Sequence, residues 1–143
     1  MEGDPGEGIY RAMIEDVDGM PVLGLAAVKL GVRPGIDIIP DQNGLVYLPS
    51  FRPDDPNGLS CSPTIGDLPV FGLPVEWGGS NTRTAVWRIE AADLGPELVA
   101  QEDTSLHSKG RHISIGPSGP MRFDEYLRAV QATRSRWTKV TKS

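Results

Sequence analysis

The run RHISIGPSGPMRFDEYLRAVQATRSRW, residues 111–137, decides the class of fold, because it places an apolar strand directly before an amphipathic helix. Residues 111–115 alternate in polarity, which is typical of a strand with His112 and Ser114 on the same face. Residues 122–137 predict a helix, since apolar side chains recur at about the 3.6-residue helical period. Together with the strand candidates that precede it, this run predicts an α+β domain.

The rest of the chain is rich in residues that break helices. Glycine supplies 17 and proline 13 of the 143 residues, about a fifth of the chain, against an average of roughly 12%. Because these are the poorest helix formers, the composition excludes a helical bundle or a coiled coil. It predicts short strands joined by long Gly/Pro-rich loops.

Several strand candidates precede the run. The most regular is 84–90 (TAVWRIE), which is rich in β-branched and aromatic residues, and the others are 9–14 and 97–102. Residues 22–30 predict a short buried helix, and residues 36–39 predict a short strand.

We expect one domain over residues 9–138, between a flexible N-terminus at 1–8 and a flexible basic tail at 139–143. The net charge of −5 argues against broad electrostatic binding to nucleic acid. No apolar stretch approaches the roughly 20 residues that span a bilayer, and the acidic N-terminus lacks the features of a secretory signal. We therefore expect a protein that acts in a cytoplasm and does not contact the membrane.

The single cysteine, Cys61, excludes an internal disulfide. His107 and His112 have no matching pair of cysteines or histidines, so no metal site is expected. Cys61 with either histidine is a nucleophile in principle, but no activating motif accompanies it. A lone cysteine is more often a small buried hydrophobe.

Three strand-like stretches carry polar residues among apolar ones: Arg11, the pair Ser60 and Ser62, and His112. Taken singly, each has an ordinary explanation. An ion pair accounts for the arginine, a turn for the serines, and a half-exposed edge strand for the histidine. Their order along the chain gives them more weight.

In this order the residues resemble the signatures of the ADP-ribosyltransferase superfamily. Tyr10-Arg11 resembles the arginine-bearing first strand of that superfamily. Ser60-Cys61-Ser62 resembles its Ser-Thr-Ser element, with cysteine at the usual threonine. His112 lies on the strand where the third signature, commonly a glutamate, is expected.

A closer resemblance is to a branch of bacterial type VI secretion effector toxins with this fold. It rests on the opening Tyr-Arg-Ala at 10–12 and on a mid-chain Asn-Gly-Leu followed by a Gly/Ser-rich strand. Its most specific part is the run HISIGP at 112–117, followed by Pro120-Met121 and a helix that ends in Arg136-Trp137. The same features occur in the same order in that branch of toxins.

The resemblance implies a fold and a site. The fold is a small split β-sandwich, in which two packed sheets form a cleft for NAD, with long Gly/Pro-rich loops and a C-terminal helix. NAD is implied as the substrate. The implied catalytic residues are Arg11, Ser60 and His112, and the residues implied to bind NAD are Tyr10, Arg11, Ser60 and Ser62. In such a fold, the Gly/Pro-rich loops are expected to wall the cleft.

The chain departs from the superfamily pattern at one point. The last strand carries no Glu-x-Glu or Gln-x-Glu, and His112 stands in that place. The nearest carboxylates, Glu102 and Asp103, lie one strand earlier. This matters because a neutral histidine accepts or donates a proton but supplies no negative charge.

The resemblance implies a toxin that acts as an NAD-dependent ADP-ribosyltransferase on a cytoplasmic target. It also implies a cognate immunity protein as partner, and delivery by a secretion machinery without a signal peptide. Two alternatives stay open: a non-catalytic binding or immunity module, and an RNA 2′-phosphotransferase-like enzyme on the same fold. A nicotinamide-release measurement separates NAD chemistry from both.

Overall fold

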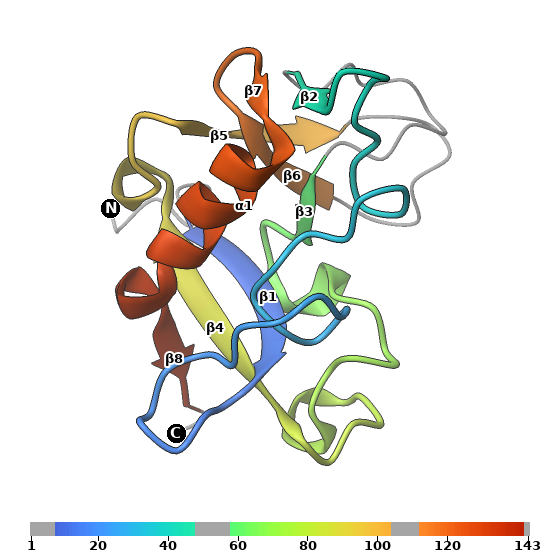
Figure 1. The fold of residues 1–143 in the computed structure, drawn as a ribbon. Helices are drawn as coiled ribbons and strands as arrows, with labels where there is room; N and C mark the ends of the chain where they lie inside the picture. Colours follow the sequence, from blue (N-terminus) through green and yellow to red (C-terminus); the bar gives the residue numbers. More distant parts are fainter. Residues whose placement is uncertain (1–7, 48–57, 104–111, 142–143) are drawn as a thin grey trace.

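The computed structural model describes residues 8–47, 58–103 and 112–141 (Figure 1). Eight short strands and one α-helix are present in these ranges. They are β1 (Gly8–Ile14), β2 (Leu45–Val46), β3 (Leu59–Cys61), β4 (Thr84–Glu90), β5 (Leu98–Asp103), β6 (His112–Pro117), β7 (Met121–Arg122), α1 (Phe123–Ala132) and β8 (Thr138–Val140). The α+β class expected from the sequence is therefore confirmed.

The strands form three small antiparallel sheets, with strand orders β1-β4-β8, β3-β6-β5 and β2-β7. The family resemblance implies two packed sheets, and the described residues form two three-stranded sheets and a third of two short strands. An antiparallel bridge between Tyr10 and Ser62 joins the first two sheets, so β1 and β3 run next to each other. This bridge brings Arg11 on β1 close to Ser60 on β3.

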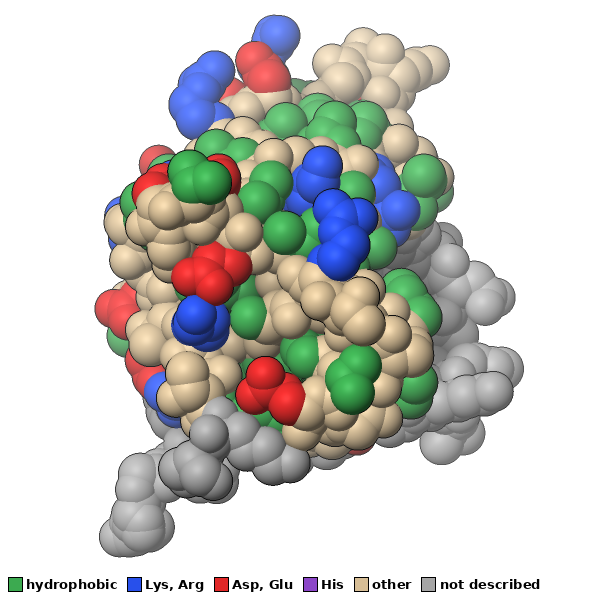
Figure 2. Space-filling view, turned by 90° about the horizontal axis from the view of Figure 1, so that it is seen from below, with side chains coloured by type: hydrophobic (Ala, Val, Ile, Leu, Met, Phe, Trp, Pro, Cys, Tyr) green, Lys and Arg blue, Asp and Glu red, His purple; other side chains and the backbone are tan. Residues whose placement is uncertain are grey.

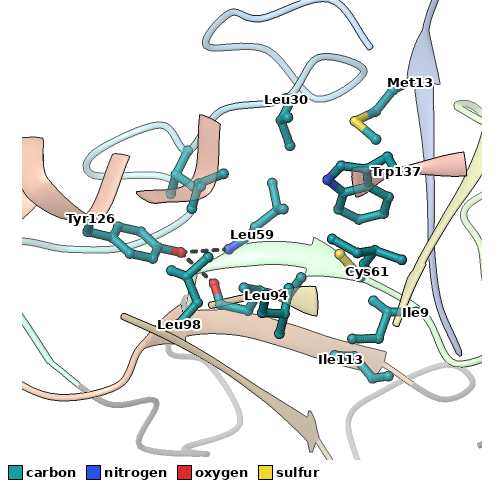
Figure 3. Close-up of a cluster of buried hydrophobic side chains, with 14 of the residues drawn as sticks. Ile9, Met13, Leu30, Leu59, Cys61, Leu94, Leu98, Ile113, Tyr126 and Trp137 are labelled. Carbon is teal, nitrogen blue, oxygen red and sulfur yellow. Dashed lines mark hydrogen bonds between the residues drawn. The ribbon is translucent and has the colours of Figure 1, made fainter. Parts of the chain in front are cut away.

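One apolar core holds the two larger sheets and the helix together (Figure 3). Tyr126 of α1 is fully buried, and its hydroxyl donates a hydrogen bond to the carbonyl oxygen of Ile115 at 2.5 Å. The same hydroxyl accepts a hydrogen bond from the backbone N–H of Leu59 at 3.1 Å. One side chain of the helix thereby fastens β3 to β6.

The strand predictions with the clearest alternation are confirmed. β4 covers the predicted residues 84–90, and β1 extends the predicted strand 9–14 by one residue. The helix predicted over 122–137 is shorter, because α1 ends at Ala132 and a 3₁₀ turn follows. The hydroxyl of Thr133 donates to the carbonyl oxygen of Val130 at 2.6 Å, which competes with continuation of the helix.

Two local predictions are wrong. Residues 22–30 form no helix: the N–H of Val22 bonds to the carbonyl oxygen of Ile14, and the N–H of Ile14 bonds to that of Val28. Those backbone groups therefore pair with the end of β1. Residues 36–39 form a turn in place of a strand, since Gly35 has a φ of +84° and the N–H of Asp37 bonds back to Arg33.

The basic tail expected from residue 139 is partly a strand. β8 pairs with β4, with Val140 opposite Val86, so residues 139 and 140 belong to a sheet. Residues 1–7 and 142–143, the remainder of the expected flexible ends, lie outside the described residues.

The surface shown in Figure 2 carries acidic and basic side chains, with apolar side chains between them. That face therefore offers no continuous surface of one charge. Within the described ranges, no helix combines the length and the apolar character needed to cross a membrane.

Candidate functional site

A cavity of about 210 Å³ opens beside β1 and β3. Its lining comes from those two strands and from three loops: Arg11, Ala12, Ala27, Val28, Arg33, Asp37, Ser60, Leu68, Pro69, Phe71 and Gly72. Two Gly/Pro-rich stretches of the sequence, 31–58 and 66–79, both contribute, the first through Arg33 and Asp37 and the second through residues within 68–72. These loops wall this cavity, and their role in an NAD cleft stays a prediction.

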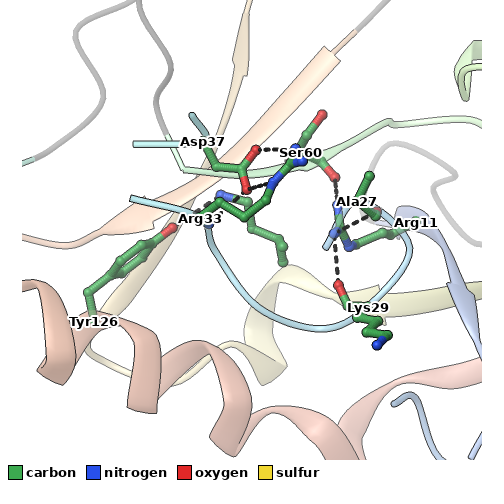
Figure 4. A network of polar contacts seen from close by, with 8 residues as sticks. Arg11, Ala27, Lys29, Arg33, Asp37, Ser60 and Tyr126 are labelled. Carbon is green, nitrogen blue, oxygen red and sulfur yellow. Dashed lines mark hydrogen bonds and ion pairs between the residues drawn. The ribbon is translucent and has the colours of Figure 1, made fainter. Parts of the chain in front are cut away.

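Arg11 is a buried residue of this lining (Figure 4). Its Nη1 donates to the carbonyl oxygen of Ser60 at 2.6 Å. Its Nη2 donates to the carbonyl oxygens of Ala27 and Lys29, both at 2.9 Å. The guanidinium therefore connects β1, β3 and the loop at 27–29, and it explains why that loop is not helical: its carbonyl oxygens point at the arginine.

Among the described residues, backbone carbonyl dipoles stabilise the charge of Arg11, and no carboxylate is bonded to it. Burial lowers the pKa of Arg11, and its Nε has no hydrogen-bond partner among these residues. Arg33 and Asp37 also line the cavity as an ion pair, so the described lining residues carry one net positive charge. Such a cavity favours an anionic ligand.

Arg33 and Asp37 form a two-pronged ion pair at the ends of one turn. Arg33 donates from Nε and Nη2 to the two carboxylate oxygens of Asp37, at 2.9 and 3.0 Å. The backbone N–H of Arg33 also donates to that carboxylate, at 2.8 Å. The bond to Asp37 raises the pKa of Arg33. This pair fixes one wall of the cavity.

Ser60 and His112 meet across the β3–β6 sheet. The distance between Ser60 Oγ and His112 Nε2 is 2.7 Å, and the tautomer of the imidazole decides which atom donates. Ser60 is opposite Ser114 in the register, and His112 lies two residues away on the same face. The structure thus links Arg11 to Ser60 through its backbone, and Ser60 to His112 through its side chain.

Tyr10 and Ser62 do not line the cavity. The Cζ atom of Arg88 lies over the ring of Tyr10, 5.9 Å from the ring centroid. The same ring packs against the apolar cluster of Leu68, Leu73 and Val86. Ser62 is buried and its hydroxyl bonds to the carbonyl oxygen of Asp67 at 3.3 Å. Because side chains alternate along a strand, Tyr10 lies on the opposite face of β1 from Arg11.

Sequence reasoning missed three cavity residues, Arg33, Asp37 and Phe71, all in loops. Phe71 is 67% exposed. The signal for it in the sequence is an aromatic residue within a Gly/Pro-rich stretch. Asp37 carried no such signal, since its stretch was predicted as a strand. In the described ranges, no cluster of three or more His, Cys, Asp or Glu side chains is arranged to hold a metal ion.

Cys61 is a buried hydrophobe, as its isolation in the sequence suggested. It is 1% exposed, and burial raises the pKa of its thiol to about 12, although the nearby Arg11 acts in the opposite direction. The thiolate form is therefore scarce at neutral pH, and the position does not suit a nucleophile.

The folded protein is accordingly expected to resist alkylation by iodoacetamide at about pH 8.5, where half of free thiols are ionised. Because the folded pKa is raised, folding favours the protonated thiol, and this contribution to stability is lost as the pH rises towards 12. Mass spectrometry of timed samples measures the labelling, and the same sample in denaturant serves as control. Labelling of the folded protein at the denatured rate contradicts the assignment.

Comparison with known proteins gives one match. The family model of the Tse2 ADP-ribosyltransferase toxin matches residues 8–140. No curated protein and no solved structure matches the chain. The matched span runs from β1 to β8 and includes every residue of the cavity.

Proposed function

Because the chain belongs to the Tse2 ADP-ribosyltransferase toxin family, we propose that it is a toxin that cleaves the nicotinamide–ribose bond of NAD and transfers ADP-ribose to a molecule in the cytoplasm of a target cell. The proposal includes delivery by a type VI secretion machinery and neutralisation by a cognate immunity protein. In it, the β1-β4-β8 and β3-β6-β5 sheets are the two halves of a split sandwich, and the cavity beside β1 and β3 belongs to the cleft between them.

The observation that carries the proposal is the chain of contacts from Arg11 through Ser60 to His112, of which Arg11 and Ser60 line the positively charged cavity and His112 lies next to Ser60 outside that lining. These residues come from three strands that are far apart in the sequence. A hydroxyl bonded to an imidazole is a common device for moving a proton. A buried arginine beside it suits a phosphate-bearing substrate.

The size and lining of the cavity suit one part of NAD. At about 210 Å³ the cavity is smaller than the roughly 300–1,000 Å³ of sites that enclose a whole ligand. It suits one ring with its ribose, and the remainder of NAD then extends past the rim, where Phe71 offers a flat apolar surface. The positive charge near Arg11 and Arg33 complements the pyrophosphate.

Within this proposal the residues have different tasks. Arg11 is a positioning residue. Its Nη1 and Nη2 already donate to three backbone carbonyl oxygens, and these bonds hold β3 and the loop at 27–29 in place beside β1. The Ser60 hydroxyl holds the imidazole of His112 in place. His112 accepts the proton of the attacking hydroxyl group, which is the task that a neutral imidazole performs well near pH 7. Tyr10 and Ser62 support the strands in place of binding NAD.

Ser60→Ala and His112→Gln test these tasks. Ser60 is exposed, so removing its hydroxyl is expected to leave the fold intact and to lower nicotinamide release about tenfold, the effect of one lost hydrogen bond. Loss of a general base by His112→Gln is expected to lower it about 100-fold. Both variants are expected to relieve growth inhibition when expressed in bacteria, while the purified proteins keep the wild-type melting temperature.

Ser118→Ala is the matched control, because Ser118 is an exposed serine in the turn after β6. It is expected to behave as wild type in both assays. If purified wild-type protein releases no nicotinamide from NAD, the NAD chemistry is wrong. If Ser60→Ala and His112→Gln remain as active and as toxic as Ser118→Ala, the site is wrong.

A further inference from the structure

Asp37 contributes a carboxylate to the cavity that also contains Arg11 and Ser60, and it is the one carboxylate among the described residues of that lining. Cleavage of a bond to the anomeric carbon of a sugar passes through a state with positive charge on the ribose. A carboxylate beside that carbon stabilises such a state. The β6 strand supplies none, because His112 stands where a glutamate is common in the superfamily.

The carboxylate of Asp37 is held in place from several sides. Arg33 donates hydrogen bonds to this carboxylate from Nε, Nη2 and its backbone N–H, at 2.8 to 3.0 Å. The backbone carbonyl oxygen of Asp37 accepts a hydrogen bond from the N–H of Gly58 at 2.7 Å. Gly58 is two residues before Ser60, so this bond fixes the turn of Asp37 relative to β3.

The same carboxylate remains accessible from the cavity. The side chain of Asp37 is 16% exposed, and that of Arg33 is 32% exposed. Figure 4 shows Arg11, Ser60 and the Arg33–Asp37 pair as neighbours in one polar network, and Asp37, Ser60 and Arg11 all line the cavity. A carboxylate that is fixed in position, partly exposed and in the same cavity lining as Ser60 has the properties that the reaction requires.

We propose that Asp37 is the catalytic carboxylate that stabilises the positively charged ribose during cleavage of NAD. The inference rests on the function proposed above. In the step, the bond between the anomeric carbon and the nicotinamide nitrogen breaks, and its electron pair leaves with neutral nicotinamide. A water molecule, or a hydroxyl group of the target, then forms a bond through oxygen to that carbon and gives its proton to His112. Asp37 keeps its charge throughout and forms no covalent bond.

A purely structural task for Asp37 makes a different prediction. If Asp37 serves only to hold the turn through Arg33, then removing either partner of the ion pair has the same effect. Asp37→Asn and Arg33→Gln therefore form a matched pair, because both remove the two-pronged ion pair and both keep a side-chain amide in hydrogen-bond reach. Only Asp37→Asn removes the negative charge from the cavity.

The experiment measures kcat and KM for nicotinamide release, together with the melting temperature, for wild type and both variants. Asp37→Asn is expected to lower kcat about 100-fold, the scale for loss of one fixed electrostatic group, with KM changed by less than about threefold. Arg33→Gln is expected to lower kcat less than about tenfold and to raise KM, because the proposed function assigns the positive charge of Arg33 to binding the pyrophosphate. The two melting temperatures are expected to fall by similar amounts.

The outcomes separate this inference from the proposed function. Equal loss of kcat in the two variants, in step with equal loss of stability, overturns the catalytic assignment of Asp37. So does full activity of Asp37→Asn when Ser60→Ala and His112→Gln are impaired, a result that leaves the proposed function standing. Absence of nicotinamide release from the wild-type protein overturns both.

Discussion

Replacing Arg11 with methionine is expected to lower the free energy of unfolding by about 4 kcal/mol. Methionine fills much of the same space and has no donors, so the carbonyl oxygens of Ser60, Ala27 and Lys29 lose their bonds to the guanidinium. Each unsatisfied buried carbonyl costs about 1–3 kcal/mol. The substitution also removes a buried charge, whose desolvation is unfavourable, and this offsets part of the destabilisation.

Urea unfolding followed by tryptophan fluorescence measures the change. Arg88→Met is the matched control: Arg88 lies opposite Tyr10 on β4, is half-buried and pairs with Glu90 at the surface. Its loss is expected to cost less than about 1 kcal/mol. Equal stabilities for the two variants contradict the assignment of Arg11 as the residue that connects β1, β3 and the loop at 27–29.

This prediction changes how activity data on Arg11 are to be understood. An inactive Arg11 variant reports loss of the fold as readily as loss of a contact with NAD. Arg11→Lys keeps the charge and up to three donors, but it lacks the planar fork that reaches two sides at once. Ser60→Ala, at an exposed side chain, is therefore the sharper test of the chemistry.

Gly58→Ala is expected to destabilise the protein by a similar amount, about 4 kcal/mol. Gly58 has a φ of +129°, a conformation that residues with a Cβ rarely adopt. An added Cβ meets the carbonyl oxygen of Ile115 at 2.4 Å and the hydroxyl of Tyr126 at 2.6 Å. These two atoms are hydrogen-bonded to each other, so the methyl group breaks the link that fastens β3 to β6.

Gly78→Ala separates the steric clash from backbone strain. Gly78 also has a positive φ, +93°, but a Cβ there meets no atom within 4 Å. Gly78→Ala is expected to lower the free energy of unfolding by about 1 kcal/mol, the cost of a left-handed backbone conformation at an L-residue without a steric clash. Thermal unfolding of both variants measures the difference, and a Gly58→Ala protein no less stable than Gly78→Ala shows that β3 tolerates the added methyl group.

The parts of the fold that could be predicted from the sequence are those that local pattern determines. β4 alternates β-branched and aromatic residues, and its bounds agree with the prediction. Residues 22–30 have an apolar composition that suits a helix, but their conformation depends on Arg11 and on the end of β1, which are distant contacts. No pattern within those nine residues carries that information.

The residues of the candidate site also differ in whether local pattern or distant contacts determine their position. Arg11, Ser60 and His112 stand out in the sequence because they are polar residues on apolar strands, and the structure brings them into contact. Asp37 and Arg33 lie in a turn whose place in the cavity depends on the bond from Gly58 to Asp37. The resemblance implies NAD binding by both Tyr10 and Arg11, whereas adjacent residues on a strand face opposite ways and Tyr10 lies outside the cavity lining.

The position of β4 between β1 and β8 also has a consequence for the order in which the fold assembles. β1 is translated before β4, and the β1-β4-β8 sheet is complete only once Val140 has left the ribosome. Tyr126, which ties β3 to β6, is translated 66 residues after Ser60. Arg11 and Ser60 are therefore synthesised well before the segments that hold them in place, so the candidate site assembles late in the folding of this domain.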